Sequence, residues 1–373
     1  MGSNSALVHK VKSDFMDKWE CCDLGNVKEF LHMHILKKND NIYLDQTVYL
    51  DKVLQCFELT NAKFVSTPLP EGYHPAPNVQ SVDTQLQTKY QQIIGSLMYI
   101  MLRTHPDIAY AVTKMAQHAA NPPQDHLNHA LHICHYLAGT SRYALIYKGK
   151  SNRGLFACAD SDRASNPADC RSTTGYMMKL TWDGIFSWNS RAQSQCTVAQ
   201  SFTEAKYMSL SDTSRQLVWI KVLLTELNIH KSPIPLCGDN QGFIFMASNP
   251  VQEQRIKHID IQYHYICEVN QQFKVGLFFI NGSENPADMF TKNLGQTKFT
   301  QFRNATHMSK VKCLAHVHPV YNVDTTQYVV ATSMYRNRAC PEVYKTSVHT
   351  PIYWFTQYEW ASHSKIQITL QVS

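Results

Sequence analysis

The pattern of apolar and polar positions predicts an alternation of helices and strands along most of the chain. Apolar residues that recur every three or four positions are typical of helices with one buried face. This spacing predicts helices over 7–15, 47–57, 90–103, 107–119 and 124–138, the last of them ended by Gly139. Short runs of strand-forming residues predict a pair of strands over 29–35 and 41–44.

The region from about 143 to 300 has a richer alternation. It predicts three strands, a long helix over 203–227, a strand, further helices, a strand over 275–281 and a last helix. Such an order favours a mixed sheet flanked by helices. A segment rich in Pro and polar residues, 67–88, predicts a linker before it. The expected fold class is therefore α/β (α+β), with at least two regions.

Four acidic residues stand in contexts that suit metal-dependent cleavage of nucleic acid. Asp160 closes an apolar run, Glu204 opens the long predicted helix, Asp239 ends a short strand-like run, and Asp288 follows Asn285-Pro286-Ala287. Carboxylates at strand ends and on helices that face the sheet can converge on two divalent ions. Singly, each acid is better explained as a helix cap, a first-turn acid, a loop acid or half of a helical ion pair. The prediction therefore depends on the ordered set of four.

The short motifs around these acids follow one another in a characteristic order. They are Asp160-Ser161-Asp162, RSTTGY at 171–176, SWNS at 187–190, Thr203-Glu204-Ala205, Asp239-Asn240-Gln241 and KHIDI at 257–261. Together they resemble the ribonuclease H domain at the end of the Pol polyprotein of Ty1/copia-type retrotransposons. Upstream, CDLGNVKEFL at 22–31, STPL at 66–69, YQQIIGSLMY at 90–99 and PDIAY at 106–110 resemble the last part of the reverse transcriptase and its connection. The resemblance covers roughly residues 1–304.

This resemblance implies a domain organisation. Residues 1–66 would be a C-terminal remnant of the reverse transcriptase, 67–88 a linker, 89–142 a helical connection and 143–304 a ribonuclease H-like domain with a mixed sheet flanked by helices. Residues 305–373 do not resemble the family and have strand-like composition. We expect this tail to be poorly ordered.

The resemblance also implies a chemistry, hydrolysis of the RNA strand of RNA–DNA hybrids by a two-metal mechanism. The cofactor would be two Mg²⁺ ions, with Mn²⁺ as a substitute. Asp160 would bridge both ions, Glu204 and Asp239 would complete one site, and Asp288 would complete the other. The expected partner is an RNA–DNA hybrid, and no obligate protein partner is identifiable from the sequence. Side chains near the acids that are candidates for contacts with the substrate's 2′-hydroxyls are Ser201, Asn240 and Gln241.

Other features weigh against activity. No Tyr-x-Asp-Asp tetrapeptide occurs in the sequence, so we expect no polymerase activity and a 5′-truncated element. Arg163 stands where the family usually has Trp, Cys170 where a basic residue is common, and Phe202 where a small hydroxyl residue is usual. Two alternatives therefore stay open, a catalytically inert folded remnant and a nucleic-acid-binding module without chemistry.

Composition changes this picture little. The net charge of +6 permits contact with a polyanion but does not demand it. No apolar run approaches the roughly 20 residues of a membrane span, and the amino-terminal stretch lacks the apolar core of a signal peptide. The 11 cysteines are scattered and include no C-x-x-C pair, which predicts reduced thiols. We therefore expect an intracellular protein without a membrane partner.

Four histidines recur at every third position of the helix predicted over 124–138, namely His126, His129, His132 and His135. A three-residue step falls about 60° short of a full turn, so the set winds around the helix. A zinc site needs about four converging ligands. We therefore predict solvated histidines and no metal site.

Overall fold

The computed structural model describes residues 5–81, 83–149, 154–165, 170–180, 184–193, 199, 201–227, 233–242, 260–272 and 274–311. The chain divides into two compact units, Glu20–Val311 and the two ends, Met1–Trp19 with Lys312–Ser373. In the unit made by the ends, the described element is helix α1 (Ser5–Lys18), which confirms the helix predicted over 7–15. Most of the predicted tail lies outside the described residues. None of the helices described is long and apolar enough to cross a membrane.

The first sheet of the larger unit is antiparallel, with the order β1-β2-β3-β4-β10. Its strands are β1 (Glu29–Phe30), β2 (Met33–Lys38), β3 (Asn41–Asp45), β4 (Tyr143–Lys148) and β10 (Met308–Lys310). The predicted strand pair is confirmed as β2 and β3, but the first of these strands begins at Met33. Leu31 and His32, with φ angles of 50° and 56°, form a turn between β1 and β2.

Two strands of this sheet come from residues outside the range 1–142, which the sequence assigns to the regions before the ribonuclease H-like domain. β4 was expected in the ribonuclease H-like unit, and β10 falls in the predicted tail. In the structure, β4 pairs with β3, and β10 pairs with β4, with Met308 opposite Leu145. Both of these side chains are buried in the core, which explains why this short segment is held against the sheet.

The helices between these strands are α2 (Thr47–Cys56), α3 (Thr84–Arg103), the 3₁₀ turn η1 (Pro106–Ile108), α4 (Ala109–Ala116) and α5 (Gln124–Thr140). Helix α3 begins inside the predicted linker because the Asp83 side chain caps it, accepting a hydrogen bond from the Gln85 amide at 2.9 Å. Helix α5 continues past Gly139, so the predicted end is wrong. A Cβ at Gly139 would lie 3.3 Å from Phe64 Cβ, so the glycine permits a close approach there.

The prediction of solvated histidines on α5 is wrong for His126, which is buried, and the other three are half-buried against the segment 63–76. His126 is 1% exposed and its ring lies 4.6 Å from that of His118. Three further contacts follow along the helix: His129 stacks on Tyr73 at 3.6 Å, His132 donates to the Thr67 carbonyl at 3.2 Å, and His135 donates to the Lys63 carbonyl at 3.1 Å. The four histidines wind around α5, and the segment 63–76 runs along them.

The second sheet has the order β7-β6-β5-β8-β9. Its strands are β5 (Phe156–Asp162), β6 (Thr173–Leu180), β7 (Gly184–Ala192), β8 (Ile234–Gly238) and β9 (Val275–Phe279). β5, β6 and β7 pair antiparallel, whereas β5–β8 and β8–β9 are parallel. Helices α6 (Phe202–Glu226) and α8 (Asp260–Gln271) precede β8 and β9 along the chain, as parallel neighbours require a crossover. The predicted mixed sheet flanked by helices is confirmed.

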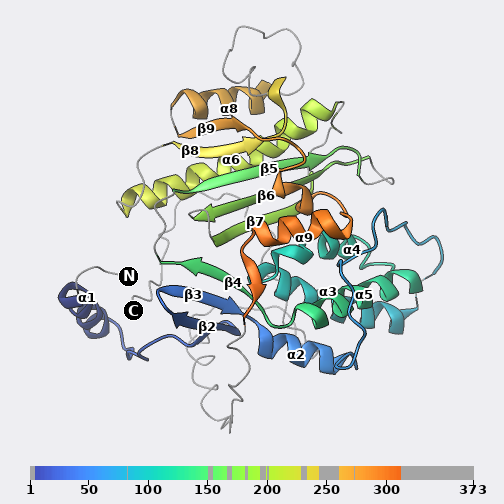
Figure 1. Cartoon of the computed structure of the whole chain (residues 1–373), viewed down its shortest axis with the longest axis horizontal. Helices are drawn as coiled ribbons and strands as arrows, with labels where there is room; N and C mark the ends of the chain where they lie inside the picture. The colour runs from blue at the N-terminus through green and yellow to red at the C-terminus, as the bar shows by residue number, and fades with distance from the viewer. Residues whose placement is uncertain are drawn as a thin grey trace, which may run out of the picture. The chain divides into compact units, whose positions relative to one another are not determined.

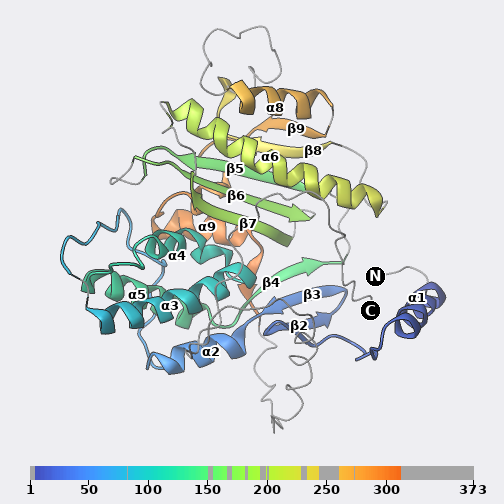
Figure 2. The ribbon, with the colours of Figure 1, turned by 180° about the vertical axis from the view of Figure 1, so that it is seen from behind.

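The two faces of this sheet are covered by different elements. Ala157 and Ala159 of β5 pack with Leu210 and Leu217 of α6, and α6 runs across this face in Figure 2. Cys158 packs on the opposite side, with the 3₁₀ turn η3 (Pro286–Phe290) and α9 (Gln296–Ala305). Figure 1 shows this orange part of the chain beside the sheet, with α9 next to β7. Because strand side chains alternate, Asp160 shares the face of Cys158.

Candidate active site

Asp160 lies near the end of β5 and is 2% exposed. Its cross-strand neighbour on β6 is Gly175. A Cβ at Gly175 would come within 2.7 Å of Phe290 Cβ, so only glycine lets η3 lie this close to the sheet. As a result, the Thr291 hydroxyl donates to Asp160 Oδ2 at 2.6 Å. The carboxylate is therefore held by a group that is 131 residues away in sequence.

Asp288 is positioned by the motif to which it belongs, Asn285-Pro286-Ala287-Asp288. The Asn285 side chain accepts a hydrogen bond from the Ala287 amide at 3.1 Å and donates to the Ala159 carbonyl at 3.0 Å. This fastens η3 to β5, next to Asp160. Asp288 is 2% exposed, and its oxygens are paired with Lys298 Nζ at 2.6 Å and Lys292 Nζ at 3.1 Å.

Asp239 follows β8 directly and is joined to Asp160 by a lysine that the sequence interpretation did not single out. Lys206 Nζ on α6 lies 2.5 Å from Asp239 Oδ2 and 3.9 Å from Asp160 Oδ1. The chain after β9 also lies close, since a Cβ at Gly282 would be 3.1 Å from Asp239 Oδ2. Three of the four predicted acids therefore surround one region, from β5, the end of β8 and η3.

The fourth predicted acid, Glu204, lies in the first turn of α6 and is half-buried. Two residues later on the same helix, Lys206 is the side chain that reaches Asp160 and Asp239. Ser201 caps this helix, its hydroxyl accepting from the Glu204 amide at 3.1 Å.

The electrostatics of the site follow from its burial. Burial first, and then the neighbouring Asp288 carboxylate, raise the pKa of Asp160 to about 6. The Thr291 hydrogen bond and the Lys292 charge work in the opposite direction. Burial disfavours the charged form of Lys292, but the carboxylates of Asp160 and Asp288 raise its pKa above the ordinary value. A region of crowded, buried carboxylates is one that favours a cation.

The donors fit a hard divalent ion in kind, because they are carboxylate oxygens from three elements. The Lys206 ammonium between Asp160 and Asp239 is a stand-in cation, which indicates that this spot accepts positive charge. As they stand, however, no three His, Cys, Asp or Glu side chains within the described ranges form a group ready to hold a metal ion. The lysines balance the carboxylates instead.

The three departures from the family pattern are all at least partly exposed. The Arg163 guanidinium lies 5.2 Å from the centre of the Phe202 ring, and Phe202 is 63% exposed. These two side chains therefore stack on each other and Phe202 is directed into solvent, not between the carboxylates. Cys170 is exposed, with a φ of 53°.

Comparison with known proteins adds to this geometry. Residues 1–71 match the family model described as reverse transcriptase (RNA-dependent DNA polymerase). The chain is 34% identical, over 80% of its length, to the retrovirus-related Pol polyprotein from transposon TNT 1-94 of Nicotiana tabacum. It is also 30% identical to the uncharacterized mitochondrial protein AtMg00810 of Arabidopsis thaliana, over 58% of this chain and 88% of that protein.

The chain belongs to the copia-type retrotransposon Pol family. This copia-type chain spans 23% of the length of the tobacco polyprotein. Among solved structures, it is similar to LC11-RNase H1 isolated from compost, with 10% identity and a TM-score of 0.30, over 37% of this chain and 93% of that one.

Sequence interpretation of this copia-type chain missed Lys206, Thr291 and Lys298. The pairing of Asp288 with Lys292, one helical turn later, is an alternative that the sequence predicts, and the structure confirms this ion pair. The missed residues come from separate elements or sit beside a more familiar motif residue. Of the predicted substrate contacts, Asn240 is half-buried and Gln241 is exposed, both directly after Asp239.

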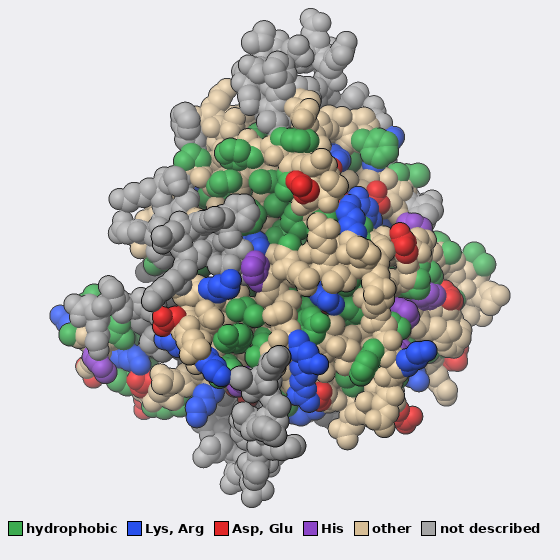
Figure 3. Space-filling view, viewed as in Figure 1, with side chains coloured by type: hydrophobic (Ala, Val, Ile, Leu, Met, Phe, Trp, Pro, Cys, Tyr) green, Lys and Arg blue, Asp and Glu red, His purple; other side chains and the backbone are tan. Residues whose placement is uncertain are grey.

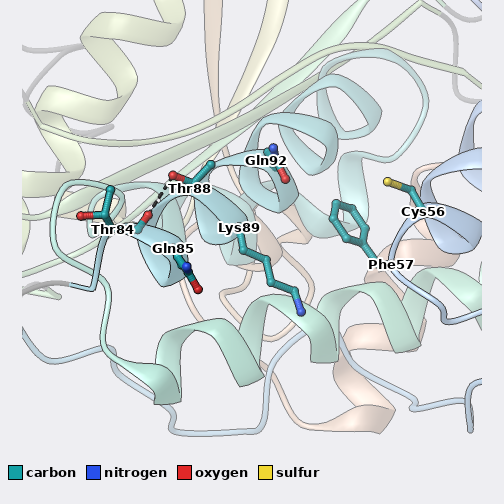
Figure 4. Close-up of a pocket in the computed structure, with 7 residues that line it drawn as sticks. All are labelled: Cys56, Phe57, Thr84, Gln85, Thr88, Lys89 and Gln92. Carbon is teal, nitrogen blue, oxygen red and sulfur yellow. Dashed lines mark hydrogen bonds between the residues drawn. The ribbon is translucent and has the colours of Figure 1, made fainter.

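A cavity of about 500 Å³ lies away from these residues. It is lined by the end of α2, including Cys56 and Phe57, and by polar side chains of α3 with Lys89, as Figure 4 shows. No carboxylate of the candidate site lines it. In Figure 3, the Lys and Arg side chains of the described residues are interspersed with other types and make no continuous basic groove on the visible face.

Proposed function

We propose that this copia-type chain acts on RNA–DNA hybrids and hydrolyses the RNA strand at the region bounded by Asp160, Asp239 and Asp288. The observation that carries the proposal is the convergence of these carboxylates from separate elements: the Lys206 ammonium bridges Asp160 and Asp239, and Asp288 lies near enough to raise the pKa of Asp160. The fourth acid first expected, Glu204, lies in the first turn of α6 and stays a candidate ligand.

Asp160, Asp239 and Asp288 are the residues that would hold Mg²⁺, or Mn²⁺ in its place. When bound, such ions supply activation of a water molecule and stabilisation of the departing oxygen. The chain's own contribution is positioning: Thr291 fixes the Asp160 carboxylate, and Asn285 fixes η3, which carries Asp288. Both anchors are buried, so the geometry is set before substrate arrives.

We assign contact with the RNA strand to Asn240 and Gln241, whose amides can both donate to and accept from a 2′-hydroxyl. Ser201 is the weaker candidate of the three, because its hydroxyl is engaged as the cap of α6. Polymerase activity is not part of the proposal, since the sequence has no Tyr-x-Asp-Asp turn.

A second candidate function is binding of the hybrid without turnover. The observation that favours it is charge balance: Lys206, Lys292 and Lys298 pair with the three carboxylates that metal ions would need. A site neutralised in this way recognises a hybrid through its surface but lacks bound ions.

The test is cleavage of a labelled RNA strand in an RNA–DNA hybrid, with Mg²⁺ or Mn²⁺. Wild type is compared with Asp239→Asn and with Asp51→Asn, a matched change at a half-buried aspartate on α2. We expect cutting of the hybrid alone, lost in Asp239→Asn and in EDTA and kept in Asp51→Asn. Binding of the hybrid by a folded protein that cuts at no metal concentration would favour the second candidate.

A further inference from the structure

Lys206 has the position of a bound ion in this site. Its ammonium lies 2.5 Å from Asp239 Oδ2 and 3.9 Å from Asp160 Oδ1, and its side chain is 21% exposed. Asp160 is almost fully buried and Asp239 is 13% exposed, so water does little to screen the three charges from one another.

The position of Lys206 is fixed by the helix that carries it. Ser209, three residues later and therefore on the same side of α6, donates its hydroxyl to the Asp160 carbonyl at 2.6 Å. Ser209 is fully buried, so this bond ties the first turns of α6 to β5. Residue 206 consequently faces the carboxylates in every conformation that keeps this contact.

We propose that Lys206 is a built-in cation that occupies the place between Asp160 and Asp239 and competes with a divalent metal ion for it. A lysine ammonium is a compact point charge on a flexible stem, and it is tethered beside the site at high effective concentration. An incoming ion meets both its charge and its volume, so it binds only when the side chain swings into solvent. The inference rests on the proposed function for its choice of metal ion.

The lysines at Asp288 differ from Lys206. Lys292 and Lys298 are 41% and 37% exposed, and both form ion pairs with Asp288. They can be displaced into water at smaller cost, because more of each side chain is already solvated. Lys206 is therefore the residue that limits metal binding between β5 and β8.

The experiment measures Mn²⁺ binding to the full chain by electron paramagnetic resonance, which detects free Mn²⁺ without any need for activity. Wild type is compared with Lys206→Gln and with Lys221→Gln, the same change about four turns further along α6. Removal of the competing charge is expected to lower the apparent Kd of Lys206→Gln by at least about tenfold. Lys221→Gln should bind as wild type does. Equal Kd values for all three proteins would overturn the proposal.

Thermal unfolding provides a second measurement. Without metal, Lys206→Gln leaves Asp160 and Asp239 without their shared cation, so its melting temperature should fall below that of wild type and recover with Mn²⁺. The variant must be folded at roughly 20 °C, about the temperature of the binding assay. If its melting temperature then does not recover with Mn²⁺, the proposed competition is contradicted.

The two proposals fail separately. If Lys206→Gln binds Mn²⁺ more tightly but no variant cleaves the hybrid, the competition by Lys206 is supported and the proposed hydrolysis is overturned. If wild type and Lys206→Gln cleave the hybrid at the same metal concentration and bind Mn²⁺ with equal affinity, the proposed hydrolysis is supported and the competition by Lys206 is overturned.

Discussion

Gly175 lies directly beneath Thr291: a Cβ at Gly175 would be 2.7 Å from Thr291 Cγ2. This contact allows the Thr291 hydroxyl to reach Asp160, the residue opposite Gly175 in the β5–β6 ladder. One missing side chain therefore positions the carboxylate at the centre of the site.

Gly175→Ala should push η3 away from the sheet. Because the clash involves the backbone and Cβ of Phe290 as well as Thr291, we expect the free energy of unfolding to fall by about 1–3 kcal/mol. Urea denaturation measures the change. The control is Gly95→Ala in α3, where nothing lies within 4 Å of the added Cβ. That variant should gain about 0.5–1 kcal/mol, and an equal loss in both variants would contradict the explanation.

Thr291→Val keeps the shape of the side chain and removes its hydroxyl. The buried Asp160 carboxylate then loses a hydrogen bond of 2.6 Å, and its pKa should rise further above about 6. We expect a loss of about 1–3 kcal/mol in the free energy of unfolding at pH 7. Thr225→Val, at an exposed helical position, is the control and should change stability by less than about 0.5 kcal/mol.

His126 should make stability depend on pH. Burial, and then the nearby His118, lower the pKa of His126 from 6.5 to about 4. In the unfolded chain the imidazole takes up a proton below 6.5, whereas in the folded protein it stays neutral until about 4. The stabilisation is therefore complete above pH 6.5 and is lost progressively as the pH falls to about 4, by up to about 3 kcal/mol. Denaturation of His126→Gln across this window should show a flatter dependence; an unchanged slope would exclude His126 as its source.

Tyr136 should be important for stability because its hydroxyl joins two buried or partly buried groups. Its hydroxyl donates to the buried Asp107 carboxylate and accepts from Arg303 Nη1 at 3.2 Å. Tyr136→Phe should lower the free energy of unfolding by about 2–3 kcal/mol, since a charged acceptor loses its donor. The control Tyr147→Phe loses a bond to the neutral Ile185 carbonyl and should cost only about 1 kcal/mol. Equal costs would show that the charge of Asp107 is not what matters.

Phe202→Ser tests whether this departure from the family pattern disturbs the fold. The ring is 63% exposed and contacts the Arg163 guanidinium, so its removal should cost less than about 1 kcal/mol. Calorimetric unfolding of Phe202→Ser measures this. A larger loss would mean that the ring packs against more than Arg163.

Most helices, the second sheet and the membership of the family could be predicted from the sequence. Periodic apolar positions predicted α2, α4 and α6 well, because a buried helical face imposes its own spacing. The sequence motifs identified Asp160, Asp239 and Asp288, because these motifs lie where β5 and β8 end and where η3 turns. Those are local properties, and nearby residues encode them.

The tertiary structure alone decided which residues meet. It put β4 and β10 in the first sheet, gave the α5 histidines the segment 63–76 as their partner, and brought Lys206 to the carboxylates of Asp160 and Asp239. Each of these depends on the packing of segments that are distant in sequence, such as the 131 residues between Asp160 and Thr291. A pattern of neighbours cannot specify such a pairing, because the side chain that faces a site is set by the helix or sheet packed across from it.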